Sequence, residues 1–371
     1  MQYKIPFIRP NYQRFYKKNK KAIDKAIQNC HTKGDYTLRS DVWKLEKSIA
    51  KLAGTKYCAS VNSGTDALFL SLLALGIGKG DEVITVSNTF IATIQAIVHT
   101  GATPILIDVK DDELMDVSQI EQAITPYTKA IIPVQYTGAL CDNEKIKEIA
   151  DRHKIPIVDD YCQALGAKGA GKFGILNAVS FNTAKLLGGL CDGGAVTTDS
   201  RELYEKICLL RNHWNVHQLS VDRTDYPQPE EMGWGWKSRL SNVNAAFLNV
   251  KLKTIKQILK RREQIALKYN KAFCGLELLT PHEQKGRIFQ EYHIVISQRE
   301  KFAEFLKKKG IETLTRDIVP NHKMKGLGLE KFNLPVTESL ARGVIRLPLH
   351  EHLTDAEVNY VISQVKTYFK S

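Results

Sequence analysis

The sequence predicts an α/β fold with a mostly parallel sheet that carries helices on both faces. Two observations predict it. From about residue 41, helical and strand-like patterns alternate along the chain. The strand-like segments, such as residues 81–86 and 155–160, are nearly continuous apolar runs, which is typical of strands buried on both faces. In sheets of this kind, ligands bind at the carboxyl ends of the strands.

The elements follow one another in a regular order. Residues 41–54 have helical spacing and end at Gly54, and an apolar helix is expected over residues 65–78. The segments that follow alternate between strand and helix: strand 81–86, helix 89–101, strand 103–109, helix 116–124, strand 128–135, helix 143–154 and strand 155–160.

The chain is long enough for two domains. Its 371 residues exceed what one hydrophobic core usually serves. One long helix is predicted over residues 242–273, and strands and helices mix after it. We therefore expect a large domain over residues 1–249, which includes the N-terminal segment, and a smaller α/β domain over residues 250–371.

Composition limits the classes of function. The net charge is +13, but the basic excess lies in short amphipathic segments such as residues 15–27, which are typical of solvated helix faces. No nucleic-acid motif is present, so we expect no nucleic-acid partner, although the charge could help attract a nucleotide diphosphate. No apolar run could cross a bilayer and no secretory signal begins the chain, so we expect a cytoplasmic protein without membrane association. The seven cysteines are scattered without a CxxC pair, which favours reduced thiols over a zinc site.

A first candidate site precedes the apolar helix at residue 65. Ser63, Gly64 and Thr65 place hydroxyl and amide groups at the start of this helix, where anions and especially phosphate bind. A helix cap formed by Ser63 or Thr65 explains the stretch equally simply, and better when it is taken alone.

Two adjacent aspartates, Asp159 and Asp160, end a buried strand. A carboxylate there is costly unless it meets a cation or several hydrogen-bond donors. It could be a metal ligand, a general base or the partner of a protonated heterocycle. No cluster of histidine and acidic residues lies nearby, so a metal is the weakest of the three, and we expect none. Two surface aspartates at a strand exit are the simpler alternative.

Residues 180–198, SFNTAKLLGGLCDGGAVTT, contain one lysine, Lys185, followed by four glycines. A lysine at a buried, glycine-lined strand end is a candidate Schiff-base nucleophile, whereas a lysine in a surface loop is the plain alternative. An anion site, a strand-end aspartate and a lysine, in this order, are the three groups that pyridoxal 5′-phosphate needs. The combination favours that cofactor.

The sequence resembles the DegT-type sugar aminotransferases, fold-type I enzymes that add amino groups to nucleotide-linked keto sugars. The resemblance covers nearly the whole chain. The motifs that carry it come in the order and spacing of the family: IPFIRP, SGTDALFLSLLALGIGKGDEVITVSNTFIATIQAI, GATPILIDV, VDDYCQALGA, SFNTAKLLGGLCDGGAVTT, LLRNHW, GWKSRLSNVNAA and RLPLHEHLTDAEVNYVI.

The resemblance implies pyridoxal 5′-phosphate as the cofactor and a role for each matching residue. Lys185 would hold the cofactor aldehyde as an imine and then shuttle a proton, and Asp160 would bind the pyridinium nitrogen. The remaining residues would only bind the cofactor: Phe90 stacked on the ring, Gln163 near the ring and its phenolic oxygen, and Gly64, Thr65 and Ser180 at the phosphate.

Three positions depart from the family pattern. Lys237 replaces an asparagine that in relatives reaches across a dimer to the phosphate of the partner's cofactor, and a lysine could do the same as a point charge. Gln135 replaces a histidine, and the bulkier Tyr161 is expected beside the site. The resemblance also implies a homodimer whose protomers share their active sites.

The retained Lys185 favours transamination, because histidine replaces this lysine in dehydratases of the family. We expect an amino-acid donor, glutamate, and a nucleotide-linked keto sugar as acceptor. The SRL triplet at residues 238–240 resembles that of family members that aminate carbon 3 of a deoxy keto sugar, so the resemblance implies a dTDP-3-keto-6-deoxyhexose and a role in making surface glycans. The alternatives are a carbon-4 aminotransferase for a UDP- or GDP-linked sugar, a non-catalytic regulator that binds the cofactor, and a nucleic-acid binder with salt-dependent affinity. Residues 213–236 could form a substrate loop or a plain surface excursion.

Overall fold

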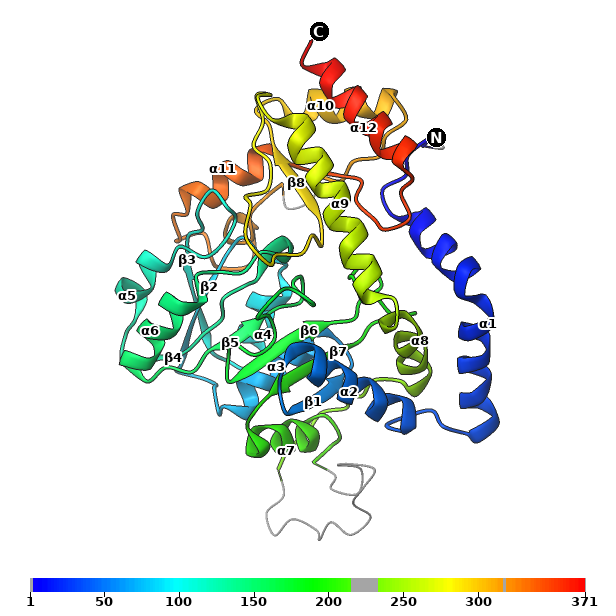
Figure 1. Ribbon diagram of the computed structural model, residues 1–371. Helices are drawn as coiled ribbons and strands as arrows, with labels where there is room; N and C mark the ends of the chain where they lie inside the picture. The colour runs from blue at the N-terminus through cyan, green and yellow to red at the C-terminus, as the bar shows by residue number, and fades with distance from the viewer. Residues whose placement is uncertain (1–2, 215–232, 316–317, 371) are drawn as a thin grey trace.

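The computed structural model describes residues 3–214, 233–315 and 318–370 (Figure 1). The substrate loop expected at residues 213–236 therefore lies largely outside the described residues. A central sheet with helices on both faces forms the larger part of the chain. Its strands fall into two hydrogen-bonded groups, given in spatial order: β1 (Tyr57–Val61), β7 (Gly194–Thr198), β6 (Leu176–Ser180) and β5 (Val158–Asp160), then β4 (Thr128–Ile131), β2 (Glu82–Val86) and β3 (Thr103–Ile107).

Two parallel bridges join these groups into one sheet. Ile131 pairs with Ile157, and Val134 pairs with Asp160, so that the chain after β4 runs beside β5. Only β7 is antiparallel to its neighbours, which are β1 and β6. The carboxyl ends of all the other strands therefore meet at one edge of the sheet, and the predicted mostly parallel sheet is confirmed.

Helices cover both faces because neighbouring residues of a strand point to opposite sides. Val83 packs into the cluster formed with α3 (Gly64–Ala74), α4 (Ala92–His99) and α7 (Arg201–Leu210). The next residue, Ile84, points the other way. The helices on that second face are α2 (Ser40–Ala53), α5 (Ile120–Ala123), α6 (Asn143–His153) and α8 (Asn242–Leu252).

The single helix predicted over residues 242–273 is two helices, α8 and α9 (Ile255–Phe273). The interruption is at Thr254, whose φ and ψ are −103° and 0° and whose hydroxyl donates to the Lys251 carbonyl at 2.8 Å. Threonine hydroxyls compete in this way with the helical hydrogen-bond pattern. The break lets α9 change direction: Ile258 packs in the core beneath α2, whereas Ile265 packs in the C-terminal core.

The C-terminal part has its own apolar core. Strands β8 (Tyr292–Val295) and β9 (Val344–Leu347) pair antiparallel, and Ile5 from the N-terminal segment also packs there and bridges to Ile311. The other helices of the described residues are α1 (Arg9–Lys33), α10 (Arg299–Lys308), α11 (Pro335–Gly343) and α12 (Asp355–Tyr368), with short 3₁₀ turns at Val117–Gln119, Tyr136–Gly138 and Asn321–Lys323. A domain division between residues 249 and 250 stays a prediction.

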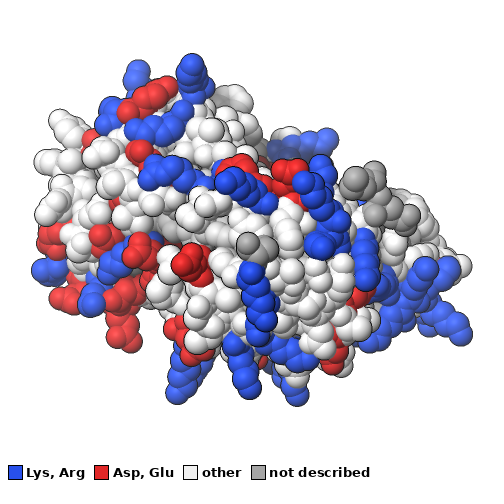
Figure 2. All heavy atoms as spheres, turned by 90° about the horizontal axis from the view of Figure 1, so that it is seen from above, with Lys and Arg blue, Asp and Glu red and all other residues white. Residues whose placement is uncertain are grey.

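The surface carries charges of both signs. Figure 2 shows basic side chains at many places around one face, with acidic side chains interspersed. All seven cysteines are free thiols. Across the described ranges, no helix combines the length and apolarity needed to cross a membrane, and no group of three or more histidine, cysteine or acidic side chains is arranged to hold a metal ion.

Candidate active site

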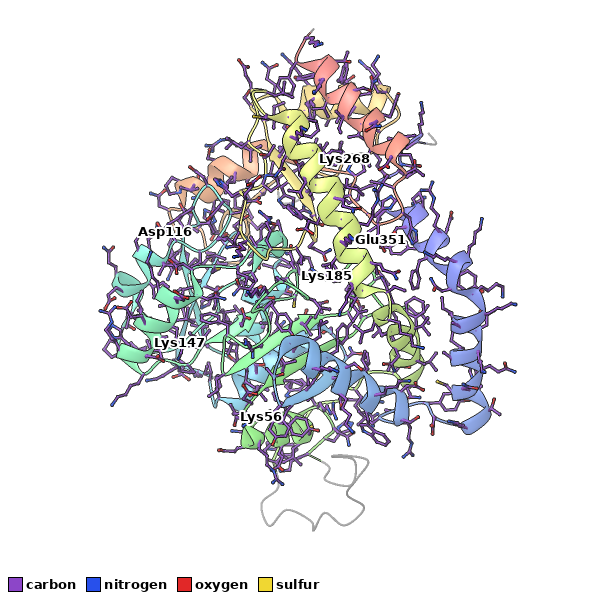
Figure 3. All side chains as sticks on the ribbon, viewed as in Figure 1. Lys56, Asp116, Lys147, Lys185, Lys268 and Glu351 are labelled. Atoms are coloured by element: carbon purple, nitrogen blue, oxygen red, sulfur yellow. The ribbon has the colours of Figure 1, made fainter. Side chains whose placement is uncertain are left out.

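The predicted site residues follow the strand ends that meet at one edge of the sheet. Asp160 is the last residue of β5, and Lys185 lies in the turn after β6. Gly64 opens α3 just after β1, and Phe90 lies in the loop after β2. Figure 3 shows Lys185 near the middle of the molecule, whereas the other lysines labelled there lie toward the outside. The fold thus brings together residues that are far apart in the sequence.

Asp160 is a buried carboxylate held by two donors. It is 5% exposed. The hydroxyl of Thr93 donates to Oδ2 at 2.9 Å, and the backbone amide of Cys162 donates to Oδ1 at 3.2 Å. The pairing of β5 with the chain after β4 fixes the backbone, since the Asp160 amide donates to the Pro133 carbonyl at 3.0 Å. The carboxylate is therefore fixed in place and directed away from Asp159.

Asp159 faces the opposite side of the strand and has a different environment. Its side chain is fully buried, and the Gln135 amide donates to Oδ1 at 2.7 Å. Its other oxygen has no hydrogen-bond partner among the described residues. Burial raises the pKa of Asp159 to about 7, against the opposing effect of the bond from Gln135. The alternative of two surface aspartates is therefore wrong, because both are buried.

Gln135 and Tyr161, two of the departures from the family pattern, point into the protein interior. Besides bonding Asp159, Gln135 accepts from the Cys141 amide at 2.7 Å. Tyr161 is fully buried in the core beneath α2, and its hydroxyl lies 3.3 Å from that of Thr197. The expectation that Tyr161 lies beside the site is wrong, because strand alternation directs it to the face opposite Asp160.

The start of α3 presents backbone amides of the kind that bind anions. Ser63 caps the helix by accepting from the Asp66 amide at 3.0 Å, so the predicted cap is present. The helix itself offers no acceptor to the amides of Gly64 and Thr65, which leaves them available to a ligand. A Cβ on Gly64 would lie 2.7 Å from the Cβ of Ser180, so only glycine lets Ser180 approach the helix start so closely.

Lys185 lies in a tight turn that requires glycine. Its amide donates to the Asn182 carbonyl at 2.8 Å, and its side chain is half-buried. A Cβ on Gly188 would lie 2.2 Å from the Thr183 carbonyl oxygen. From α8, Asn244 accepts from the Leu190 amide at 2.8 Å and so fixes the far side of the turn. Within the described ranges, the Lys185 amine has neither a hydrogen bond nor an ion pair.

Gln163 and Phe90 lie at the same edge of the sheet. Gln163 is 9% exposed and accepts from the Thr137 amide at 3.1 Å. Phe90 is 60% exposed although it is large and apolar, and its carbonyl accepts from the Thr93 amide at 3.1 Å. Phe90 thus has an exposed ring, and its backbone is bonded to Thr93, the residue whose hydroxyl holds Asp160.

Lys237 lies near the anion site of its own chain. Together with Thr65 and Asp66 it lines a cavity of about 360 Å³ at the start of α3. The neighbouring Ser238 donates to Asp66 at 2.6 Å, which ties the segment to the helix start. The reach of Lys237 toward a partner protomer stays a prediction.

The sequence did not predict the residues of other elements that hydrogen-bond to Asp160 and to the backbone around Lys185. Thr93 left no local signal, because its partner Asp160 lies 67 residues away on another element. Asn244 and Gln290, which bond the backbone around Lys185, left no local signal.

The model of the DegT/DnrJ/EryC1/StrS aminotransferase family matches residues 17–366. The chain belongs to this family. The dTDP-3-amino-3,6-dideoxy-alpha-D-galactopyranose transaminase of Aneurinibacillus thermoaerophilus is 34% identical over 98% of this chain and 99% of its own length. The UDP-2-acetamido-2-deoxy-3-oxo-D-glucuronate aminotransferase of Pseudomonas aeruginosa is 33% identical over 92% of this chain and 94% of its own. The crystal structure of S. venezuelae DesV with a ketimine intermediate superimposes with a TM-score of 0.91, at 32% identity, over 100% of this chain and 99% of that one.

Aminotransferases of the DegT/DnrJ/EryC1/StrS family use pyridoxal 5′-phosphate, and the residues of this chain fit it. A fixed, buried carboxylate, Asp160, suits a protonated ring nitrogen. Glycine at residue 64 brings the Ser180 hydroxyl close to the free amides at the start of α3, the kind of donor set that a phosphate needs. The exposed ring of Phe90 and the unpaired amine of Lys185 complete the set of groups.

Proposed function

We propose that this aminotransferase moves the amino group of L-glutamate to carbon 3 of a dTDP-3-keto-6-deoxyhexose. The observation that carries the proposal is the convergence of Lys185, Asp160 and the start of α3 at one sheet edge. The family membership supports the reaction class, and the retained Lys185 supports transamination over dehydration.

The chain's own residues would bind and orient the cofactor. Pyridoxal 5′-phosphate, when bound, supplies an aldehyde that carries the amino group and a ring that withdraws electrons from the reacting carbon. Asp160, fixed by Thr93 and the Cys162 amide, would keep the ring nitrogen protonated. The phosphate would lie against the amides of Gly64 and Thr65, with the Ser180 hydroxyl beside them.

The other side chains would orient the ring. Phe90 offers an exposed face for stacking, and Gln163, which already accepts from the Thr137 amide, would lie near the phenolic oxygen of the ring. Phe90 and Gln163 would thus hold the ring in one orientation.

Lys185 would carry the chemistry. Its amine would hold the cofactor covalently until a substrate amine replaces it. The freed amine would then remove the proton from the donor's α-carbon and, in the second half-reaction, deliver a proton to the sugar carbon that receives nitrogen. The absence of any competing ion pair at Lys185 within the described ranges leaves this amine available.

The names of the two relatives favour carbon 3 over carbon 4. One name contains 3-amino and the other 3-oxo, although one sugar is linked to dTDP and the other to UDP. The position is thus shared while the nucleotide varies. A UDP- or GDP-linked 4-keto sugar remains the second candidate.

We infer a cytoplasmic homodimer that makes amino sugars for surface glycans. The shared site follows from the family resemblance, in which the residue at position 237 approaches the phosphate of the partner's cofactor; in this chain Lys237 is exposed and lines the cavity at the start of α3. Replacement of Lys237 by alanine would then weaken cofactor binding in the dimer without changing the fold.

The test is an amino-transfer assay with purified protein, pyridoxal 5′-phosphate and glutamate. The acceptors are dTDP-linked 3-keto and 4-keto 6-deoxyhexoses and their UDP and GDP counterparts, with products identified by mass spectrometry and the position of nitrogen by NMR. We expect amination at carbon 3 of the dTDP sugar. Amination only at carbon 4 would support the second candidate, and no amination with any donor would support a cofactor-binding regulator.

A further inference from the structure

Gln290 contacts the peptide groups on both sides of Lys185. Its Oε1 accepts from the Leu186 amide at 3.0 Å, and its Nε2 donates to the Ala184 carbonyl at 3.0 Å. The side chain is 5% exposed, so water does not compete for these bonds. Gln290 comes from the C-terminal part of the chain, just before β8, and both ends of its amide are used at this one turn.

Gln290 is itself fixed by the backbone on both sides. The backbone amide of Gln290 donates to the Thr137 carbonyl at 3.2 Å, and its backbone carbonyl accepts from the buried Arg262 of α9. Arg262 also donates through Nε to the Phe289 carbonyl at 2.8 Å. Because its backbone is anchored, the side-chain amide of Gln290 acts on Lys185 from a rigid support.

The same support reaches the opposite side of the site. The Thr137 carbonyl accepts from Gln290, whereas the Thr137 amide donates to Gln163 at 3.1 Å. Thr137 therefore links Gln290, and through it the Lys185 turn, to Gln163 by a continuous set of hydrogen bonds. A shift of Gln290 would move both groups relative to each other.

The next residue, Glu291, lies on the Lys185 side as well. Its carboxylate is bonded by His293 Nε2 at 3.0 Å and by Arg346 Nε at 3.0 Å. Burial raises the pKa of Glu291, but the bond from His293 and the charges of Arg346 and Lys185 outweigh it and hold the pKa at about 2. The segment before β8 therefore supplies the amide that holds the backbone around Lys185 and a negative charge that interacts with the Lys185 amine.

We propose that Gln290 is a positioning residue for Lys185. By holding the peptide groups of residues 184 and 186, it directs the amine toward the cofactor and the substrate carbon. The inference rests on the proposed role of Lys185. Loss of both bonds would let the turn relax, and displacement of a reacting group by about 1 Å can cost up to roughly 100-fold in rate.

An exposed glutamine, Gln284, offers a control for the loss of the same bond pattern. Gln284 also uses both ends of its side-chain amide, but both bonds go to Leu140 and not to the residues around Lys185. Its Oε1 accepts from the Leu140 amide at 2.8 Å, and its Nε2 donates to the Leu140 carbonyl at 2.6 Å. Gln290→Met and Gln284→Met each remove one such pair of side-chain hydrogen bonds and keep a side chain of similar length. Gln290→Glu keeps the acceptor for the Leu186 amide and loses the donor.

The experiment compares these three variants with the wild type as full-length holoenzymes. Three measurements are made: hydrogen exchange of the peptide covering residues 182–187, the rate at which the visible band grows when pyridoxal 5′-phosphate is added, and steady-state kinetics that give kcat and KM for glutamate. In Gln290→Met we expect hydrogen exchange to become about tenfold faster, and the rate of band growth and kcat each to fall about tenfold. The KM for glutamate should not change. Gln290→Glu should be intermediate and Gln284→Met should match the wild type.

Two results would overturn the inference separately from the proposed function. If the wild type forms a Lys185-dependent band and Gln290→Met matches it in all three measurements, Gln290 does not position Lys185. If Gln284→Met shows the same losses as Gln290→Met, the effect is a general one of stability. If the wild type itself forms no Lys185-dependent band, the proposed function is wrong and the inference falls with it.

Discussion

Thr93 Oγ1 donates a hydrogen bond of 2.9 Å to Asp160 Oδ2, across 67 residues of sequence. Both side chains are buried. The bond joins the first turn of α4 to the end of β5, and Thr93 also contacts the hydroxyl of Thr89 at 2.8 Å. The orientation of the carboxylate that would face the cofactor ring thus depends on a neighbouring loop and helix.

The Thr93→Val variant should bind the cofactor more weakly. A hydrogen bond to a charged group contributes about 1.5–3 kcal/mol, so we expect the dissociation constant for pyridoxal 5′-phosphate to rise about tenfold or more. Fluorescence or absorbance titration measures it. Thr85→Val is the control, because it removes another buried hydroxyl bond, of 2.9 Å to the Ile132 carbonyl, without touching Asp160. Equal losses of affinity in both variants would contradict the account.

The buried pair of Glu46 and Arg211 should matter greatly for stability. Arg211 NH1 donates to Glu46 Oε1 at 2.6 Å, and the same oxygen accepts from the Ser60 amide at 2.8 Å. Glu46→Ala would leave the arginine charge buried without compensation, at a cost of about 3–5 kcal/mol in the free energy of unfolding. Chemical denaturation measures it. The control is Glu205→Ala, which breaks a surface pair with Arg201 and should cost less than about 1 kcal/mol. Similar costs for the two variants would show that burial is not the cause.

His350 should make the protein sensitive to acid. It is 1% exposed and neither ring nitrogen has a partner among the described residues. Burial, reinforced by the charge of Arg262, lowers the pKa of His350 to about 3, whereas an unfolded histidine has a pKa of about 6.5. Between these values only the unfolded chain takes up the proton, so stability falls as the pH drops below about 6.5.

Replacement of His350 should remove this loss. His350→Leu and His350→Gln should each recover roughly 1–2 kcal/mol relative to the wild type on going from pH 7.5 to pH 5. Urea unfolding at the two pH values measures the change, and the glutamine variant separates the loss of ionisation from added apolar contact. An unchanged pH dependence in both variants would show that His350 is not the group responsible.

The parts of the site that follow strand ends could be predicted from the sequence, and the parts that support them could not. Asp160 ends one apolar strand and Lys185 lies in the turn that follows another, so the general rule for ligand sites in parallel sheets predicted their location. The direction of Tyr161 follows from strand alternation, because the residue after Asp160 points to the opposite face of the sheet. The break at Thr254 depends on one hydroxyl bond within an otherwise helical pattern.

Long-range support left no local pattern. Asn244 and Gln290 reach the Lys185 turn from α8 and from the segment before β8, and both are polar residues within apolar segments. Their role depends on which helix and strand pack together, which hydrophobic periodicity does not specify. The same holds for Thr93, whose partner Asp160 lies on another element.

The most direct test of the account is the visible absorption spectrum of the protein loaded with pyridoxal 5′-phosphate, before and after excess glutamate. It is recorded for the wild type, for Lys185→Ala and for Lys56→Ala, an exposed lysine far from Lys185 in Figure 3. We expect glutamate to remove the band of the wild type and of Lys56→Ala, and we expect Lys185→Ala to lack this band. A Lys185→Ala protein with the wild-type band and response, or a wild type whose band persists with every amino donor, would contradict it.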